Sequence, residues 1–154
     1  MALTWANAGM TFGSVTTYEN IAYDKIIDGM ITILADNLKI PISMDSHIGN
    51  HSILLVPQED NLLDLLAGGQ SREYTILISY ELTTGGNFSE NTFKQLSNTA
   101  EKIKRLFAPD KNADVTGYWI AGKIESVIYE RDEDEENKIR ALLTFNCIHV
   151  EATS

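Results

Sequence analysis

The feature that most restricts the fold of this chain is a period-two alternation of apolar and polar side chains over residues 72–83. Successive side chains of a β-strand point to opposite faces, so this pattern predicts a strand with one buried face and one polar face. One-sided burial is typical of antiparallel sheets. The predicted buried face consists of Tyr74, Ile76, Ile78, Tyr80 and Leu82.

Two other segments have helical periodicity. In residues 18–37, apolar side chains recur at steps of three and four, and Thr17 is placed to cap the first turn. Residues 89–107 carry a similar stripe, with Glu90 in the first turn and basic residues in the last turns, as the helix dipole favours. We therefore expect two amphipathic helices. Their apolar stripes are Tyr23, Ile26, Ile27, Met30, Ile33 and Leu34, and Phe93, Leu96, Ala100, Ile103 and Phe107.

The remaining segments complete a mainly antiparallel sheet. Short strands are expected at 40–44 and 52–56, and a long hairpin from strands 118–130 and 138–150. The leucine-rich residues 62–66 predict one or two helical turns that end at Gly68 and Gly69. The sum is an α+β domain in which a mainly antiparallel β-sheet packs against two amphipathic helices.

Length and charge restrict the function. The 154 residues suffice for one domain, which we place at 18–154, and 12 basic against 22 acidic residues give a net charge of −10. So acidic a chain is poorly suited to binding a phosphate backbone. We expect residues 1–17 to form an extended N-terminal arm, packed on its own domain or on a neighbouring subunit. With no signal peptide or membrane span in the sequence, we expect a soluble protein made inside the cell.

Residues that could support catalysis or metal binding are few. His47 and His51 are four apart, but Gly49 and Asn50 break any helix between them and no third ligand is evident. Cys147 and His149 share a strand face without a third group to orient them, so we interpret both as packed side chains. We find no phosphate-binding glycine loop. The sequence therefore predicts no catalytic, cofactor-binding or metal-binding residues, no cofactor and no enzyme activity.

Two charged segments have a structural and a functional interpretation. Residues 130–136 contain six acidic residues and Arg131, a net charge of −6 + 1 = −5. This acidic tip is either a solvated turn or a surface that lines a cavity or repels nucleic acid. The basic residues of the second helix form either a solvated face or a docking face for an acidic surface, such as the tip of an adjacent copy. The tip consists of Asp132, Glu133, Asp134, Glu135 and Glu136, and the basic patch of Lys94, Lys102, Lys104, Arg105 and Lys111.

Taken together, these elements resemble the tail terminator (tail completion) proteins of long-tailed bacteriophages. The resemblance covers most of the chain after residue 18 and is one of element order and pattern. It rests on the helix 18–37, the strand REYTILISY (72–80), the helix end AEKIKRL (100–106) and WIAGKIESV (119–127), followed by the acidic turn and the closing strand to Val150. The N-terminal arm has no counterpart in the pattern.

The resemblance implies a structural protein of the virion, made in the host cytoplasm. Such proteins form a hexameric ring that caps the tail tube, stops its polymerisation and presents a surface to the neck of the head. Their partners are other copies of the chain, the tail tube protein and a neck or head-completion protein, while DNA passes through the lumen without specific binding and no membrane is involved. Two alternatives are a neck or head-tail joining protein and a non-viral small intracellular binding module.

The resemblance also suggests which residues make contacts. We expect the strand 72–83 to contribute to an interface by edge pairing or sheet continuation. The acidic tip would face the lumen or a partner. The candidate residues of the interface with a subunit or the tube are Arg72, Tyr74, Tyr80, Lys102, Lys104, Arg105 and Trp119.

Overall fold

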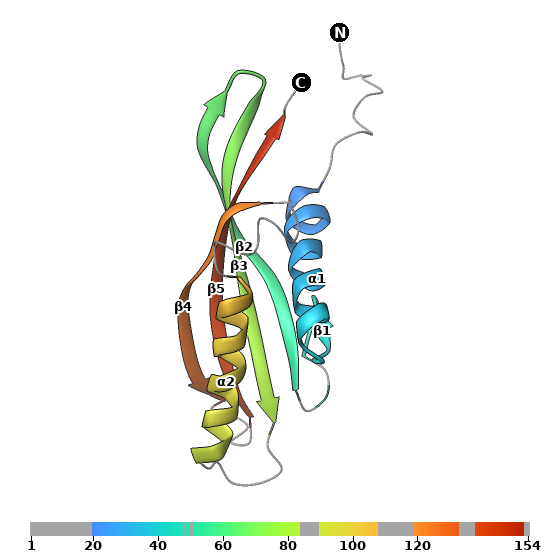
Figure 1. The fold of residues 1–154 in the computed structure, drawn as a ribbon, viewed down its shortest axis with the longest axis vertical. Coiled ribbons are helices and arrows are strands. Elements are labelled where there is room, and N and C mark those ends of the chain that lie inside the picture. The colour runs from blue at the N-terminus through green and yellow to red at the C-terminus, as the bar shows by residue number, and fades with distance from the viewer. Residues whose placement is uncertain are drawn as a thin grey trace.

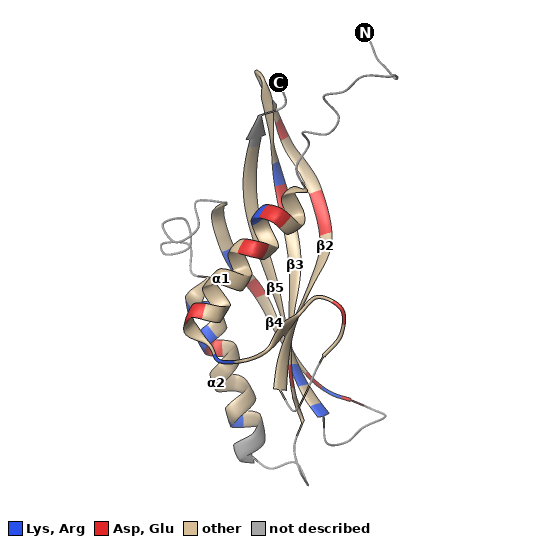
Figure 2. Cartoon of the chain, turned by 90° about the vertical axis from the view of Figure 1, so that its right-hand side faces the viewer, with Lys and Arg blue, Asp and Glu red and all other residues tan. Residues whose placement is uncertain are grey.

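The computed structural model describes residues 20–47, 49, 51–83, 90–107, 119–132 and 138–152. In these parts the chain forms a five-stranded sheet, and both helical segments lie on the same face of it (Figures 1 and 2). The prediction of an α+β fold with a mainly antiparallel sheet and two helices is confirmed. The predicted N-terminal arm, residues 1–17, lies outside the described residues.

The sheet has the order β1-β2-β3-β5-β4, which puts the strongly alternating strand β3 in the centre. It is antiparallel to β2 on one side and to β5 on the other, and β4 is antiparallel to β5. The short strand β1 is parallel to β2. The strands are β1 (Ile42–Ser43), β2 (His51–Leu66), β3 (Gly69–Thr83), β4 (Ile120–Arg131) and β5 (Lys138–Ala152).

The prediction of helical turns at 62–66 is wrong, because these residues continue β2. Leu66 pairs with Gly69, so the hairpin closes through the two-residue loop Ala67-Gly68. Gly68 has φ +83°, the left-handed conformation that such tight loops need and that glycine adopts without a steric penalty. The glycine that was expected to end a helix therefore reverses a strand, and β3 begins earlier than predicted.

The two strands predicted near Ile42 and Ile53 exist, but the first is only two residues long. It runs parallel to the second, and the Ile53 amide donates to the carbonyl of Pro41 at 2.8 Å. The connection between them passes from the helix-covered face to the opposite face of the sheet (Figure 2). His47 is thereby brought to the face without helices.

The first helix begins later than predicted and in a different geometry. It consists of a π-helical segment, η2 (Ile21–Ile27), followed by α1 (Asp28–Asn37). Asn20 caps it, since its side-chain oxygen accepts from the amide of Tyr23 at 3.3 Å. The predicted cap Thr17 lies outside the described residues. The second helix, α2 (Glu90–Leu106), agrees with the prediction, although its predicted cap Ser89 is also outside them.

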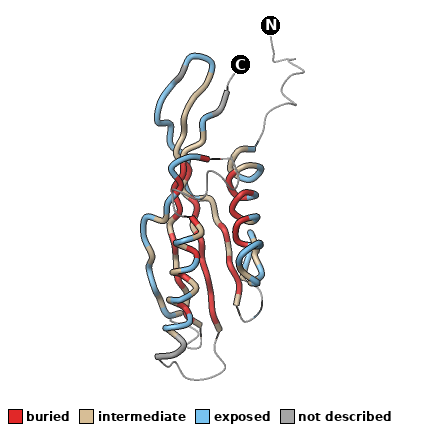
Figure 3. The backbone as a smooth tube through the Cα atoms, in the orientation of Figure 1, coloured by how far each residue is buried: buried red, intermediate tan, exposed pale blue. Residues whose placement is uncertain are grey.

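The core lies between the helices and one face of the sheet (Figure 3). All five residues of the predicted buried face of β3 are buried, and so are five of the six in the stripe of the first helix. Tyr23, the sixth, is exposed. An aromatic cluster closes the core beside α2: the ring centroids of Phe145 lie 4.9 Å from those of Phe107 and 5.3 Å from those of Trp119. These predicted core positions are confirmed.

The hairpin of β2 and β3 extends past the helical layer (Figure 1). We call its outer part, residues 59–73, the distal hairpin, and the helix-covered remainder of the molecule the body. The end of β5 accompanies the distal hairpin, since Gly69 pairs with Ala152. The strands there continue without a helix above them, and Figure 3 shows the end of the hairpin as exposed.

Candidate functional site

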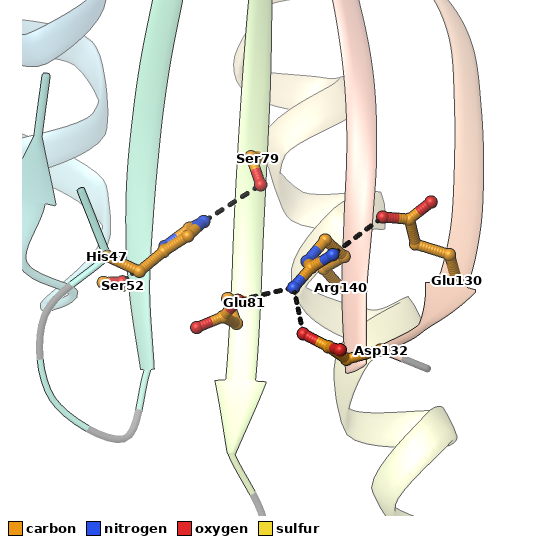
Figure 4. Close-up of polar contacts among 7 residues, drawn as sticks. All are labelled: His47, Ser52, Ser79, Glu81, Glu130, Asp132 and Arg140. Atoms are coloured by element: carbon orange, nitrogen blue, oxygen red, sulfur yellow. Dashed lines mark hydrogen bonds and ion pairs between the residues drawn. The ribbon is translucent and has the colours of Figure 1, made fainter. Parts of the chain in front are cut away.

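The polar face of β3 is more buried than the sequence predicts. Ser79 and Glu81 are only 5% and 7% exposed, although no described helix covers this face. Their partners come from the loop before β2 and from β5 (Figure 4). We call this side of the sheet the open face. Its buried polar groups are the first candidate site.

His47 bridges two strands of the open face. Its Nδ1 lies 2.6 Å from the hydroxyl of Ser52 and its Nε2 lies 3.0 Å from that of Ser79. A neutral imidazole has one donor and one acceptor nitrogen, so one hydroxyl donates to the ring and the other accepts from it. Burial lowers the pKa of His47, and the nearby Glu81 carboxylate opposes this shift only in part. The neutral ring fastens the loop to the sheet.

Arg140 is the centre of an ion-pair cluster on the same face (Figure 4). Its guanidinium lies 3.1 Å from Glu81, 3.0 Å from Glu130 and 2.9 Å from Asp132. The carboxylates belong to β3, to β4 and to the residue after β4. Burial by itself would lower the pKa of Arg140, but the hydrogen bonds that its guanidinium donates to these carboxylates raise this pKa above its ordinary value. We call these four residues the Arg140 cluster; it ties three segments together.

The Arg140 cluster changes the interpretation of the acidic tip. Three carboxylates and one guanidinium give −3 + 1 = −2, so the cluster keeps a net negative charge. Asp132 was predicted to belong to a solvated or partner-facing tip, but it turns inward to Arg140. Its inward position follows from the pairing of its amide with the carbonyl of Lys138 at 3.0 Å. The other predicted tip residues, Glu133, Asp134, Glu135 and Glu136, lie outside the described residues.

The other candidate reactive groups are held in packing positions. Cys147 is 1% exposed, and burial raises the pKa of its thiol far above the ordinary value. A thiol in this environment is not a nucleophile at neutral pH. Neither His47 nor His51 belongs to a metal site, since within the described residues no three His, Cys, Asp or Glu side chains are placed so that they could hold a metal ion. No helix in the described part of the chain is long and apolar enough to cross a membrane.

The distal hairpin is the second candidate site, and it carries an unusual concentration of exposed leucine. Leu62, Leu63 and Leu65 are 47%, 49% and 72% exposed. Leu62 lies opposite Arg72 and Leu65 opposite Gln70, so both share the face of the sheet that forms the core further along at Tyr74. Adjacent exposed apolar side chains of this kind mark interaction surfaces.

The predicted interface residues of β3 lie in two environments. Arg72 belongs to the distal hairpin, where its Nε lies 2.6 Å from the carboxylate of Asp60. Tyr74 and Tyr80 are core residues that are 5% and 1% exposed, and Tyr80 hydrogen-bonds Thr99 of α2. Edge pairing by β3 is excluded, because β2 and β5 occupy both of its edges. The body of β3 is thus a core element of this chain.

The remaining predicted interface residues also divide into buried and exposed positions. Trp119 is 3% exposed and packs in the aromatic cluster. Lys104 forms an ion pair with Glu101 at 2.6 Å within α2. Lys102 and Arg105 are exposed on the outer side of the same helix, and Lys111 lies outside the described residues. The exposed candidates are thus the basic residues of α2 and the distal hairpin.

Sequence reasoning missed two features. The distal hairpin was hidden because a leucine-rich run before two glycines suits a helix end as well as a hairpin. One signal was available: four leucines in five residues give too few turns for an amphipathic helix and are too apolar for a solvated one. The Arg140 cluster was hidden because its members are far apart in the chain; Arg140 is separated from Glu81 by 59 positions.

No protein-family model matches the chain, and no curated protein matches it significantly.

Proposed function

We propose that this protein is a structural component of a phage virion that assembles into a ring, caps the tail tube and offers an attachment surface to the neck. The distal hairpin is the observation that carries the proposal. It places three exposed leucines outside the body of the subunit. A projecting apolar element of this kind can form an interface with a neighbouring subunit.

Symmetry explains why such a projection suits a cap. A protrusion that binds a different surface on the next copy makes a head-to-tail contact, and head-to-tail contacts generate a ring when the rotation closes. A closed ring has no free end, so it can occupy the end of a tube and stop its growth. The proposal also rests on the sequence resemblance, which implies an α+β fold, the class observed here.

Charge supports the passage of DNA through such a ring. The chain has a net charge of −10, and the Arg140 cluster retains excess carboxylate on the open face. A lumen lined by carboxylates repels the phosphate backbone and lets it slide.

The first experiment tests the proposal at the level of assembly. Purified protein is examined by sedimentation velocity and negative-stain imaging, alone and with tail tubes, and ring-shaped particles at tube ends are the expected result. A phage from which the gene is deleted should make tails of abnormal length. Tails of normal length joined to heads would contradict the proposal, and tails of normal length that stay separate from the heads would favour the head-tail joining alternative.

A variant test links assembly to the distal hairpin. The triple change L62S/L63S/L65S should abolish ring formation while the subunit stays folded, because these side chains are already accessible to water. Ile128→Ser is the matched control, since Ile128 is 56% exposed on β4 in the body. Rings that persist in the triple variant would show that the leucines do not contribute to assembly.

A further inference from the structure

The outer face of α2 is basic. Lys94, Lys102 and Arg105 are exposed at helical spacing, on the side opposite the buried stripe. Over its full length, Glu90–Leu106, the helix has four basic residues and two acidic residues, so its charge is +4 − 2 = +2. The chain as a whole has a net charge of −10. Such a surface selects an acidic partner.

The distal hairpin has the complementary charge. Residues 59–73 contain Glu59, Asp60, Asp64 and Glu73 against Arg72, which gives −4 + 1 = −3. Arg72 is already engaged with Asp60, while the exposed Glu59 and Asp64 form no ion pair within the described residues. The hairpin and the helix thus carry opposite charges.

The distal hairpin and the outer face of α2 also match in length and in chemistry. Lys94 and Arg105 are about 17 Å apart along a helix that rises 1.5 Å per residue. Residues 59–66 span about 23 Å as a strand. The exposed leucines need an apolar partner, and the methylene stems of Lys102 and Arg105 can supply one while their charged ends meet carboxylates.

Leu62 and Leu65 lie on the core-side face of the hairpin, whereas Glu59 and Asp64, which pair with Thr75 and Ser71, lie on its other face. The outer edge of β2 separates these faces and has no strand partner there within the described residues. A helix that lies along this edge can therefore contact both the leucines and the carboxylates.

The two surfaces cannot meet within one subunit. The distal hairpin projects from one end of the sheet, and α2 lies toward the other end (Figure 1). Only a second copy can bring a distal hairpin to the basic face of α2. The contact is between unlike surfaces, so it repeats from copy to copy in one direction.

We infer that the distal hairpin of one subunit binds the basic outer face of α2 on the next copy of this chain. The inference rests on the proposed ring and assigns its contact surfaces. The acidic tip is the competing occupant of the helix face, but residues 131–137 contain no apolar side chain. The tip would leave the leucines of the hairpin without a partner.

Charge reversal with complementation tests the inference. In E59K/D64K the hairpin becomes basic, and in K102E/R105E the helix becomes acidic; each variant alone should associate at least about tenfold more weakly than the wild type. Circular dichroism and thermal unfolding confirm that both fold, since all four residues are exposed. Sedimentation velocity and native mass spectrometry measure the assembly.

Two mixtures make the test specific. Equal amounts of the two variants should assemble again, because each contact in an alternating ring then joins opposite charges. The quadruple variant E59K/D64K/K102E/R105E should assemble alone. The tip variant E133K/E135K should assemble like the wild type.

The outcomes separate this inference from the proposed function. Rings that form in both single-surface variants, or rings lost in the tip variant and restored by K102E/R105E, would overturn the inference and leave the ring proposal standing. A wild-type chain that stays monomeric at its highest soluble concentration would also overturn the inference. The tail lengths of the deletion phage test the capping function independently of this result.

Discussion

The strands β2 and β3 run through both the body and the distal hairpin, yet their apolar side chains are buried in the body and exposed in the hairpin. In the body, Ile76 and Ile78 of β3 are fully buried beneath the helices. In the distal hairpin, Leu65 of β2 is 72% exposed.

The register of β2 against β3 shifts between Pro57 and Glu59 and again between Leu62 and Asp64, but both strands continue through these shifts. Leu62 and Leu65 still lie on the face that forms the core further along, so a change of face is not the cause. The difference lies in the helical layer, which covers the body and ends before the hairpin.

The comparison teaches that strand pairing and core formation are separate events here. Hydrogen bonds in the ladder extend β2 and β3 well past the helices. Burial requires a second layer, and the described part of the chain supplies one only over the body. Apolar residues beyond that layer remain available to a partner, which is the basis of the proposed assembly.

The largest expected difference between the regions is in the cost of removing a side chain. Phe145→Ala should lower the free energy of unfolding by about 3–5 kcal/mol, because Phe145 is fully buried between Phe107 and Trp119. Leu65→Ala in the hairpin should change it by no more than about 0.5 kcal/mol. Urea unfolding of the two variants measures both. Equal losses would mean that the hairpin belongs to the cooperative core.

The second comparison concerns ion pairs. Arg140→Ala should destabilise by about 2 kcal/mol, because it leaves the Glu81 side chain, only 9% exposed, next to two other carboxylates. Arg72→Ala in the distal hairpin should cost about 1 kcal/mol or less, since its partner Asp60 is 45% exposed. Thermal unfolding at low ionic strength distinguishes them. A larger loss from Arg72→Ala would reverse the assigned roles of the two regions.

The smallest expected effect is the pH dependence that His47 adds to the body. Burial lowers the pKa of His47 in the folded state, so between that pKa and about 6.5 the unfolded chain binds more protons. The stability contributed by the neutral ring is therefore complete above about pH 6.5 and falls as the pH drops below it. Urea unfolding between pH 7 and pH 5 should show this slope.

Two substitutions isolate the contribution of His47. The change His47→Gln should reduce the fall in stability between pH 7 and pH 5. His51→Gln should leave it as in the wild type, because His51 forms neither of the bonds to Ser52 and Ser79. An unchanged slope in His47→Gln would assign the pH dependence to the carboxylates instead.

Much of the fold could be predicted from the sequence because periodicity is a local property. The alternation around Tyr80 predicted a strand with one buried face, and the stripe through Leu96 predicted the second helix. The final strand was predicted with Cys147 in the core, as observed. Each of these patterns depends only on how side chains repeat along a single element.

The candidate sites could not be predicted in the same way. Arg140 meets Glu81 through the pairing of β3 with β5, and His47 reaches Ser79 through a loop that crosses to the open face. These juxtapositions depend on which strands become neighbours, and nothing local in the sequence states that. The expectation that Tyr74 and Trp119 are available to a partner failed for the same reason, because their burial depends on the layer above them.

The sequence by itself determined which residues form strands and helices, which faces are apolar and how acidic the chain is, because these follow from side-chain chemistry and spacing. Only the tertiary structure decided which apolar faces pack against a second layer and which stay exposed. Gly68 turned a leucine run into a projecting strand, and the helices stopped short of it. Leu65 is exposed because the helices end before they reach it, and burial of a strand face requires a second layer above it.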